Sequence, residues 1–185
     1  MAASDSATRL RALAHPLRWK LLDLVSSEGE ATATRCSQVL GESVASCSYH
    51  LGILGKYGYL QQVTDTPGRE KPWRPLERTQ NLSAQGPELE DQLASEAAVE
   101  AFLDHEFERI KARQRLRAGE PTAWRKASRV GGSSMWVTAE ELQAITEALT
   151  PLLHRYEERA EDPSQRPPGA REARVFFSTS VQPPS

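Results

Sequence analysis

Two short helical patterns, separated by a turn of only three residues, constrain the fold of this chain more than any other feature. The first pattern spans residues 34–40 and ends at Gly41. The second begins after Ser43, a residue suited to cap a helix, and is closed by Gly58 as a left-handed C-terminal residue. Each has an apolar stripe at helical spacing, formed by Cys36, Val39 and Leu40 and by Cys47, Leu51 and Leu54. The pattern predicts two short helices that pack through these stripes.

The flanking segments add further elements to this pair. Pro16 is expected to begin a helix, because its missing N–H costs nothing at the first helical position, and a shorter helix over 6–14 precedes it. After the pair, strand-like residues 59–64 and 73–79 enclose a charged, turn-rich segment. We therefore expect a β-hairpin with a basic tip.

The outer face of the second helix carries small or polar side chains instead of apolar ones. These are Ser46, Ser48, Tyr49 and His50. Such groups fit a DNA groove and can hydrogen-bond base edges or phosphates, and a tightly joined helix pair presents its second helix to the major groove. The hairpin adds cations that would reach neighbouring phosphates, namely Arg69, Lys71 and Arg74. The sequence predicts double-stranded DNA as a partner.

Composition limits the other function classes. The chain has 23 Lys and Arg against 25 Asp and Glu, a net charge of −2, so a uniformly basic surface is excluded and only a local basic face is compatible with DNA binding. Two cysteines exclude a disulfide scaffold and favour a reducing, cytoplasmic location. No apolar run approaches the ~18 residues of a membrane span, so we expect no membrane contact.

The order of these elements resembles the winged helix-turn-helix repressors of the ArsR type. Two phrases carry the resemblance, the first being His15, Pro16, Leu17 and Arg18 followed by Leu21 and Leu22, and the second Ser43, Ser48, His50, Leu51, Leu54 and Gly58. The match covers residues 8–79. It implies that Arg18 contacts phosphate, that the second helix from Ser43 to Lys56 contacts DNA, and that residues 65–74 form a wing. It also implies dimerisation through flanking helices.

The chain departs from this family in two respects. Some members bind metal with a Cys-x-Cys site on the first helix of the pair, where this chain has Cys36 alone. Others use an Asp-x-His pair and a second His on the long helix, but here Asp104 and His105 are adjacent and no His follows in that helix. A soft metal needs at least three converging ligands, so we expect no metal site and no cofactor. The second departure is the additional region 120–185.

Residues 88–118 form one long helical pattern. At 1.5 Å per residue it would extend about 45 Å, more than a small domain can cover. Its apolar stripe predicts a homodimer interface formed by Leu93, Ala97, Leu103, Phe107 and Ile110. We therefore divide the chain into a DNA-binding domain at 1–80 and a dimerisation and effector-sensing region at 81–185.

The remaining residues predict further strands and a helix. Alternation at 133–138 and 172–181 favours strands, and Thr138 with Glu141 forms a capping box that opens a helix. The predicted fold class is mainly α with small β: a winged helix-turn-helix domain, a long dimerisation helix and a small α+β C-terminal region.

Three hypotheses for function follow. The first is a homodimeric, sequence-specific transcriptional regulator acting as a repressor. The second adds a pocket for a small-molecule effector within 120–181, coupled to DNA affinity. The third is a winged-helix module that binds protein and not DNA. We expect no enzyme, because no Ser/His/Asp arrangement, phosphate-binding glycine loop or carboxylate pair stands out.

Overall fold

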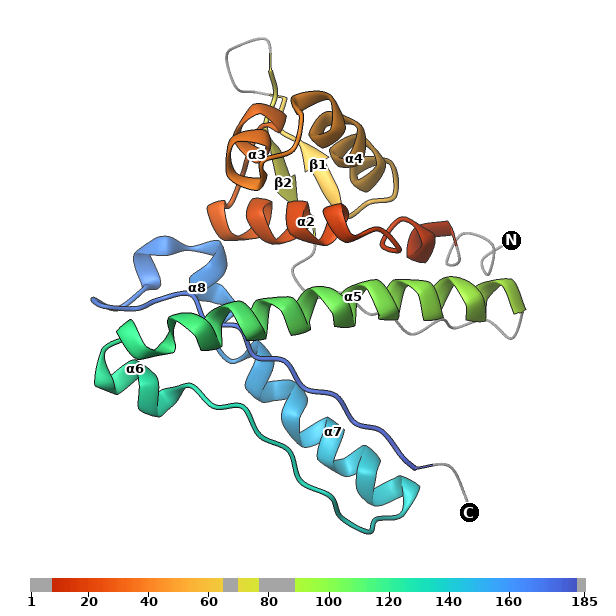
Figure 1. The fold of residues 1–185 in the computed structure, drawn as a ribbon, viewed down its shortest axis with the longest axis vertical. Helices are drawn as coiled ribbons and strands as arrows, with labels where there is room; N and C mark the ends of the chain where they lie inside the picture. Colours follow the sequence, from red (N-terminus) through yellow and green to blue (C-terminus); the bar gives the residue numbers. More distant parts are fainter. Residues whose placement is uncertain (1–7, 65–69, 77–88, 183–185) are drawn as a thin grey trace. The chain divides into compact units, whose positions relative to one another are not determined.

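The computed structural model describes residues 8–64, 70–76 and 89–182 (Figure 1). In these ranges the chain is mainly helical, with one small antiparallel sheet of two strands. It divides into two compact units, residues 1–119 and 120–185, and each unit is described by itself.

The first unit is built from short helices around two strands. These elements are α2 (Pro16–Glu28), α3 (Ala33–Leu40), α4 (Val44–Lys56), β1 (Leu60–Gln62) and β2 (Trp73–Pro75). Figure 1 shows α3 and α4 on either side of the strands, with α2 across their base. Apolar side chains from these elements form one core, and its fully buried members include Leu21, Val25, Cys36, Leu51 and Leu54.

The helix ends follow the local sequence signals. Pro16 is the first residue of α2, and the Nδ1 atom of His15 accepts a hydrogen bond from the Leu17 N–H at 3.1 Å. Gly41 and Gly58 have φ values of 72° and 74°, a region that glycine adopts without strain, and they follow α3 and α4 as predicted. Val39 is the exception to the predicted apolar stripes: it is 46% exposed and does not point inward.

The two strands form the paired part of the expected hairpin. Leu60 lies opposite Pro75, and Gln62 lies opposite Trp73. Ala31 extends this pairing, because its N–H donates to the Trp73 carbonyl at 3.0 Å and its carbonyl accepts from the Trp73 N–H at 2.8 Å. Of the wing predicted at 65–74, residues 65–69 lie outside the described residues.

The long helix α5 (Leu89–Leu116) confirms the pattern predicted over 88–118, and a 3₁₀ turn at Arg117–Gly119 follows it. Its 28 residues extend about 42 Å. One face packs on α2, with Ala94 and Ala98 buried in the core of the first unit. Because of this packing α5 belongs to the first compact unit, which ends at residue 119.

Within its described residues, the second unit contains three α-helices and a 3₁₀ turn at Pro163–Gln165. The α-helices are α6 (Thr122–Ala127), α7 (Ala139–His154) and α8 (Glu158–Glu161). The predicted capping box opens α7: Thr138 Oγ1 accepts from the Glu141 N–H at 3.2 Å, and Glu141 Oε2 accepts from the Thr138 N–H at 2.8 Å. Arg171 forks onto Glu120, with Nη1 and Nη2 donating at 2.6 and 3.0 Å, and its guanidinium lies over the Trp124 ring.

The strands expected at 133–138 and 172–181 are not formed, so that prediction is wrong. Within the described residues of the second unit there is no strand, and the region is helical with irregular segments instead of α+β. Alternating side chains favour a strand only when a neighbouring strand pairs with its N–H and C=O groups. No described residue of this unit is buried, and Trp136 is fully exposed.

Cys36 and Cys47 are free, buried thiols in the core of the first unit. Burial raises the pKa of both thiols, and that of Cys36 to about 11. Among the described helices, none is long and apolar enough to cross a membrane.

Candidate nucleic-acid interface

Helix α4 has one buried face and one polar, exposed face. Ser43 caps its N-terminus, with its hydroxyl oxygen accepting from the Ser46 N–H at 3.0 Å. Cys47, Leu51 and Leu54 are fully buried, which confirms the predicted stripe and fixes the rotation of the helix. This rotation leaves Tyr49 63% exposed. A long side chain with a hydroxyl group is therefore directed to solvent from the middle of α4.

The predicted DNA contacts on α4 have different exposures. Ser43, Ser48, Tyr49 and Lys56 are exposed, whereas Ser46 is half-buried. The Lys56 ammonium lies over the Tyr57 ring, 5.3 Å from its centroid. Most of the predicted set thus lies on the solvent side of α4.

His50 does not lie on the exposed face, and this placement corrects the sequence prediction. Its side chain is 8% exposed, and its Nδ1 accepts a hydrogen bond from Arg18 Nε at 3.2 Å. The centroid of its ring lies 4.4 Å from the centroid of the His15 ring. Burial lowers the pKa of His50, and the neighbouring His15 and Arg18 lower it further.

Arg18 is half-buried and is attached to the first unit by side-chain hydrogen bonds. Besides His50, its Nη1 donates to the Ala12 carbonyl at 2.8 Å and to the Arg11 carbonyl at 3.4 Å. The resemblance implied a phosphate contact for this residue. In the structure its Nε and Nη1 join the segment before α2 to the middle of α4, and the phosphate contact stays a prediction.

The remaining predicted cations belong to the segment that includes β2, in which Arg74 lies, whereas Lys71 precedes the strand. Lys71 is half-buried and Arg74 is exposed, whereas Arg69 lies outside the described residues. When the Gln61 amide is oriented with its oxygen toward Arg74, this oxygen accepts from Arg74 Nη2 at 2.9 Å and from Nε at 2.6 Å. Arg74 is thus steadied across the sheet.

Two residues that the sequence analysis missed attach the hairpin to the helix pair. Glu70 Oε1 accepts from the Thr34 N–H at 2.8 Å, so a carboxylate satisfies a free donor at the N-terminus of α3. Trp73 lies against α4 at Gly55. No local signal identifies either contact, because each joins segments far apart in the sequence.

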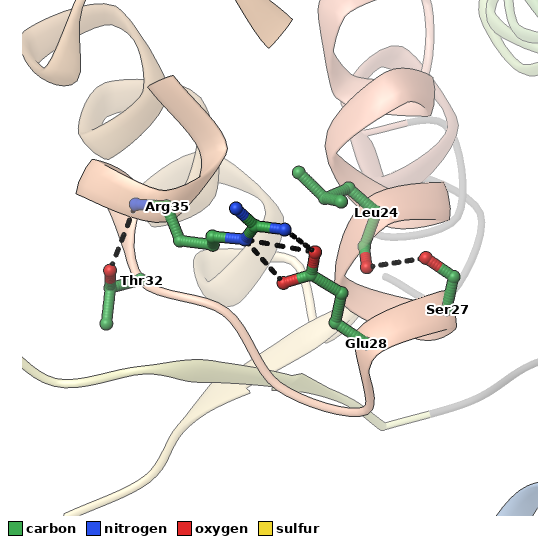
Figure 2. A network of polar contacts seen from close by, with 5 residues as sticks. All are labelled: Leu24, Ser27, Glu28, Thr32 and Arg35. Carbon is green, nitrogen blue, oxygen red and sulfur yellow. Dashed lines mark hydrogen bonds and ion pairs between the residues drawn. The ribbon is translucent and has the colours of Figure 1, made fainter. Parts of the chain in front are cut away.

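A forked ion pair attaches α2 to α3 (Figure 2). Arg35 Nε donates to both Glu28 oxygens at 3.0 and 3.1 Å, and its Nη2 donates to Oε1 at 2.7 Å. Thr32 caps α3 beside this pair by accepting from the Arg35 N–H at 3.2 Å. The hydrogen bonds from Arg35 lower the pKa of Glu28.

The predicted dimer stripe lies on α5 away from the buried alanines. Leu93 is 55% and Phe107 50% exposed, while Ala97, Leu103 and Ile110 are half-buried. The opposite face binds α2 through a cluster that the sequence analysis missed. There, Asp23 Oδ2 lies 2.6 Å from His105 Nε2 and also accepts from Arg109.

Comparison with known proteins adds no assignment: no protein-family model matches the chain, and no curated protein is significantly similar to it. Among the described residues, no group of three or more His, Cys, Asp or Glu side chains is arranged to hold a metal ion. The burial and contacts described above define the candidate interface as the exposed face of α4 and the adjoining strands.

Proposed function

We propose that this chain is a DNA-binding transcriptional regulator of the winged helix-turn-helix type, a repressor that acts as a homodimer. Helix α3, the turn at 41–43 and α4 are the helix-turn-helix, and α4 enters the major groove. The hairpin of β1 and β2 is the wing and lies on the phosphate backbone.

The observation that carries this proposal is the composition of the exposed face of α4. Exposed Ser48 and Tyr49 and half-buried Ser46 are short or planar side chains with donors and acceptors, and they lie on a helix whose opposite face is buried in the core. Rigid positioning and polar side chains are what readout of base edges requires. A protein-binding helix would present larger apolar anchors at the two serine positions.

The dimer is supported by the half-exposed stripe of α5. A single winged helix buries little DNA, and two copies on half-sites one helical turn apart provide the area and the symmetry of a specific complex. Leu93 and Phe107 are large apolar side chains that solvent would otherwise contact. The effector-gated hypothesis has no comparable support, because no described residue at 120–182 is buried.

The test is selection of a preferred duplex from a random-sequence DNA library, followed by band shifts with the selected and a shuffled duplex. We expect the selected duplex to bind more tightly, and both affinities to fall steeply with salt as counterions compete for phosphates. Failure to enrich any sequence, or equal affinity for both duplexes, would contradict the proposal.

A double variant then tests the exposed face of α4. Ser46→Ala with Tyr49→Ala should reduce discrimination between the two duplexes by about 1–3 kcal/mol for each base that these side chains read. The control is Tyr156→Ala, which removes a tyrosine of similar exposure, 57% against 63%, from outside α4. The control should discriminate like the wild type. If the double variant does so as well, α4 does not read bases through these residues.

A further inference from the structure

His50 is a buried imidazole in the middle of α4, between exposed Tyr49 and buried Leu51. Its Nδ1 lies 3.2 Å from Nε of Arg18, which donates the hydrogen bond. A guanidinium has no acceptor, so this contact requires a lone pair on Nδ1 and places the imidazole proton on Nε2. The observed geometry therefore belongs to neutral His50.

The same guanidinium connects α4 to the segment before α2, and His15 adds a second connection. Its Nη1 donates to the Ala12 carbonyl at 2.8 Å, which attaches the segment before α2. The ring of His15 lies 4.4 Å from that of His50, and His15 Nδ1 accepts from the N–H of Leu17 in the first turn of α2. His50 is thus the contact through which α4 is joined to the start of α2.

The charges around His50 disfavour its protonation. His15 and Arg18 face it from the start of α2, Tyr49 from its own helix, and Glu42 from the turn between α3 and α4. Burial lowers the pKa of His50 below its usual 6.5, His15 and Arg18 act in the same direction, and Glu42 opposes them. Protonation would turn Nδ1 into a donor facing a donor, beside a fixed positive charge.

We propose that His50 is a positioning residue for α4: neutral His50, held by Arg18, keeps α4 in its DNA-binding orientation, and protonation of His50 releases it. The protein then loses DNA affinity as the pH falls through the range in which histidine titrates. This inference rests on the proposed DNA-binding function for its effect on affinity, but the contact itself can be tested without DNA.

The first experiment measures stability. The folded protein binds the His50 proton less tightly than the unfolded chain, so stability is fully present above pH 6.5 and is lost as the pH falls through the lowered pKa. His50→Asn keeps an acceptor near the position of Nδ1 and does not titrate. We expect the wild type to lose more stability than His50→Asn between about pH 8 and about pH 5.5 in urea unfolding.

Two further measurements sharpen this experiment. His154→Asn replaces a histidine on α7 that pairs with Glu157 at the surface, and it should keep the wild-type loss. In the wild-type protein, NMR titration should place the pKa of His50 below 6.5, which is informative even if the variant does not fold. A His50 that titrates at or above that value, or an undiminished pH loss in His50→Asn, would overturn the inference.

The second experiment measures affinity for the selected duplex at constant ionic strength. We expect the wild type to bind several-fold less tightly at about pH 5.5 than at about pH 8, because His50 takes up a proton more readily when α4 is released than when Arg18 holds it. His50→Asn should show no such loss. Because added positive charge ordinarily strengthens DNA binding, the direction of this effect is diagnostic.

The remaining outcomes are distinct. If wild-type affinity rises on acidification and His50→Asn removes the rise, His50 contacts phosphate directly and the positioning role is wrong. If no duplex is bound at either pH, the proposed function fails together with the affinity half of the inference. The stability experiment still decides whether neutral His50 holds α4.

Discussion

At position 55 helix α4 has glycine, because a neighbour occupies the space that a larger side chain would need. A Cβ atom built on Gly55 would lie 2.3 and 2.8 Å from two carbons of the Trp73 indole. The indole is fixed in turn, since the backbone N–H and C=O of Trp73 are both bonded to Ala31. This one position therefore sets how closely β2 approaches α4.

We predict that Gly55→Ala lowers the free energy of unfolding by about 1–3 kcal/mol, the usual cost of forcing extra atoms into a packed site. The matched control is Gly52→Ala in the same helix, where a Cβ would meet nothing within 4 Å. There alanine should stabilise the protein by up to about 1 kcal/mol, because it restricts the unfolded chain and favours the helix. Urea unfolding of both variants measures the difference, and equal effects would refute the close packing.

Among the elements, α5 is attached to α2 by apolar packing together with one polar cluster. Asp23 accepts hydrogen bonds from His105 and Arg109, next to the ring contact between Trp19 and Phe102. The His105 side chain is only 10% exposed, so competing water has little access to its end of the contact, whereas Asp23 is 30% exposed. The cluster fixes the position of α5 along α2.

Asp23→Asn keeps the size of the side chain and removes the charge that both partners face. We expect it to lower stability by about 1 kcal/mol, a value reduced for the partial exposure of Asp23 and Arg109. Glu108→Gln is the control, because it removes the exposed partner of Lys111 on the same helix and should cost almost nothing. Thermal unfolding compares the two. A smaller loss of stability for Asp23→Asn than for the control would show that packing alone holds α5.

Features that are determined within one helical turn could be predicted from the sequence, whereas features that depend on distant residues could not. The ends of α2, α3 and α4 were predictable, because caps and glycines at positive φ act within one turn. The burial of His50 was not, since it depends on Arg18, which lies 32 residues away. The strands predicted at 133–138 and 172–181 failed for the same reason: alternation is local, but a strand needs a partner.

At the scale of the whole molecule, the distribution of apolar surface along α5 favours assembly. Its buried face contributes alanines to the core, while the other face keeps Leu93 and Phe107 about half exposed. Apolar surface of this kind on a long helix is typical of a subunit interface. The remaining residues of the stripe follow the same side of α5.

We predict that Phe107→Asp yields monomers by light scattering and weakens binding to the selected duplex, because a charge at the centre of the proposed dimer interface would be buried unpaired. Leu116→Asp is the control, since Leu116 is a similarly exposed side chain on α5 that is not part of the stripe, and it should leave the dimer intact. A dimer of unchanged affinity in Phe107→Asp would place the interface on another surface of the chain.

The two thiols of the first unit also determine how the protein can be studied chemically. With a pKa of about 11, Cys36 is almost entirely protonated at neutral pH, and maleimides and related reagents attack the thiolate. Cys47 is equally buried, so both native cysteines are shielded from alkylation. A single cysteine introduced at the exposed Ser48 would then take up a fluorophore or spin label selectively in the otherwise unaltered chain.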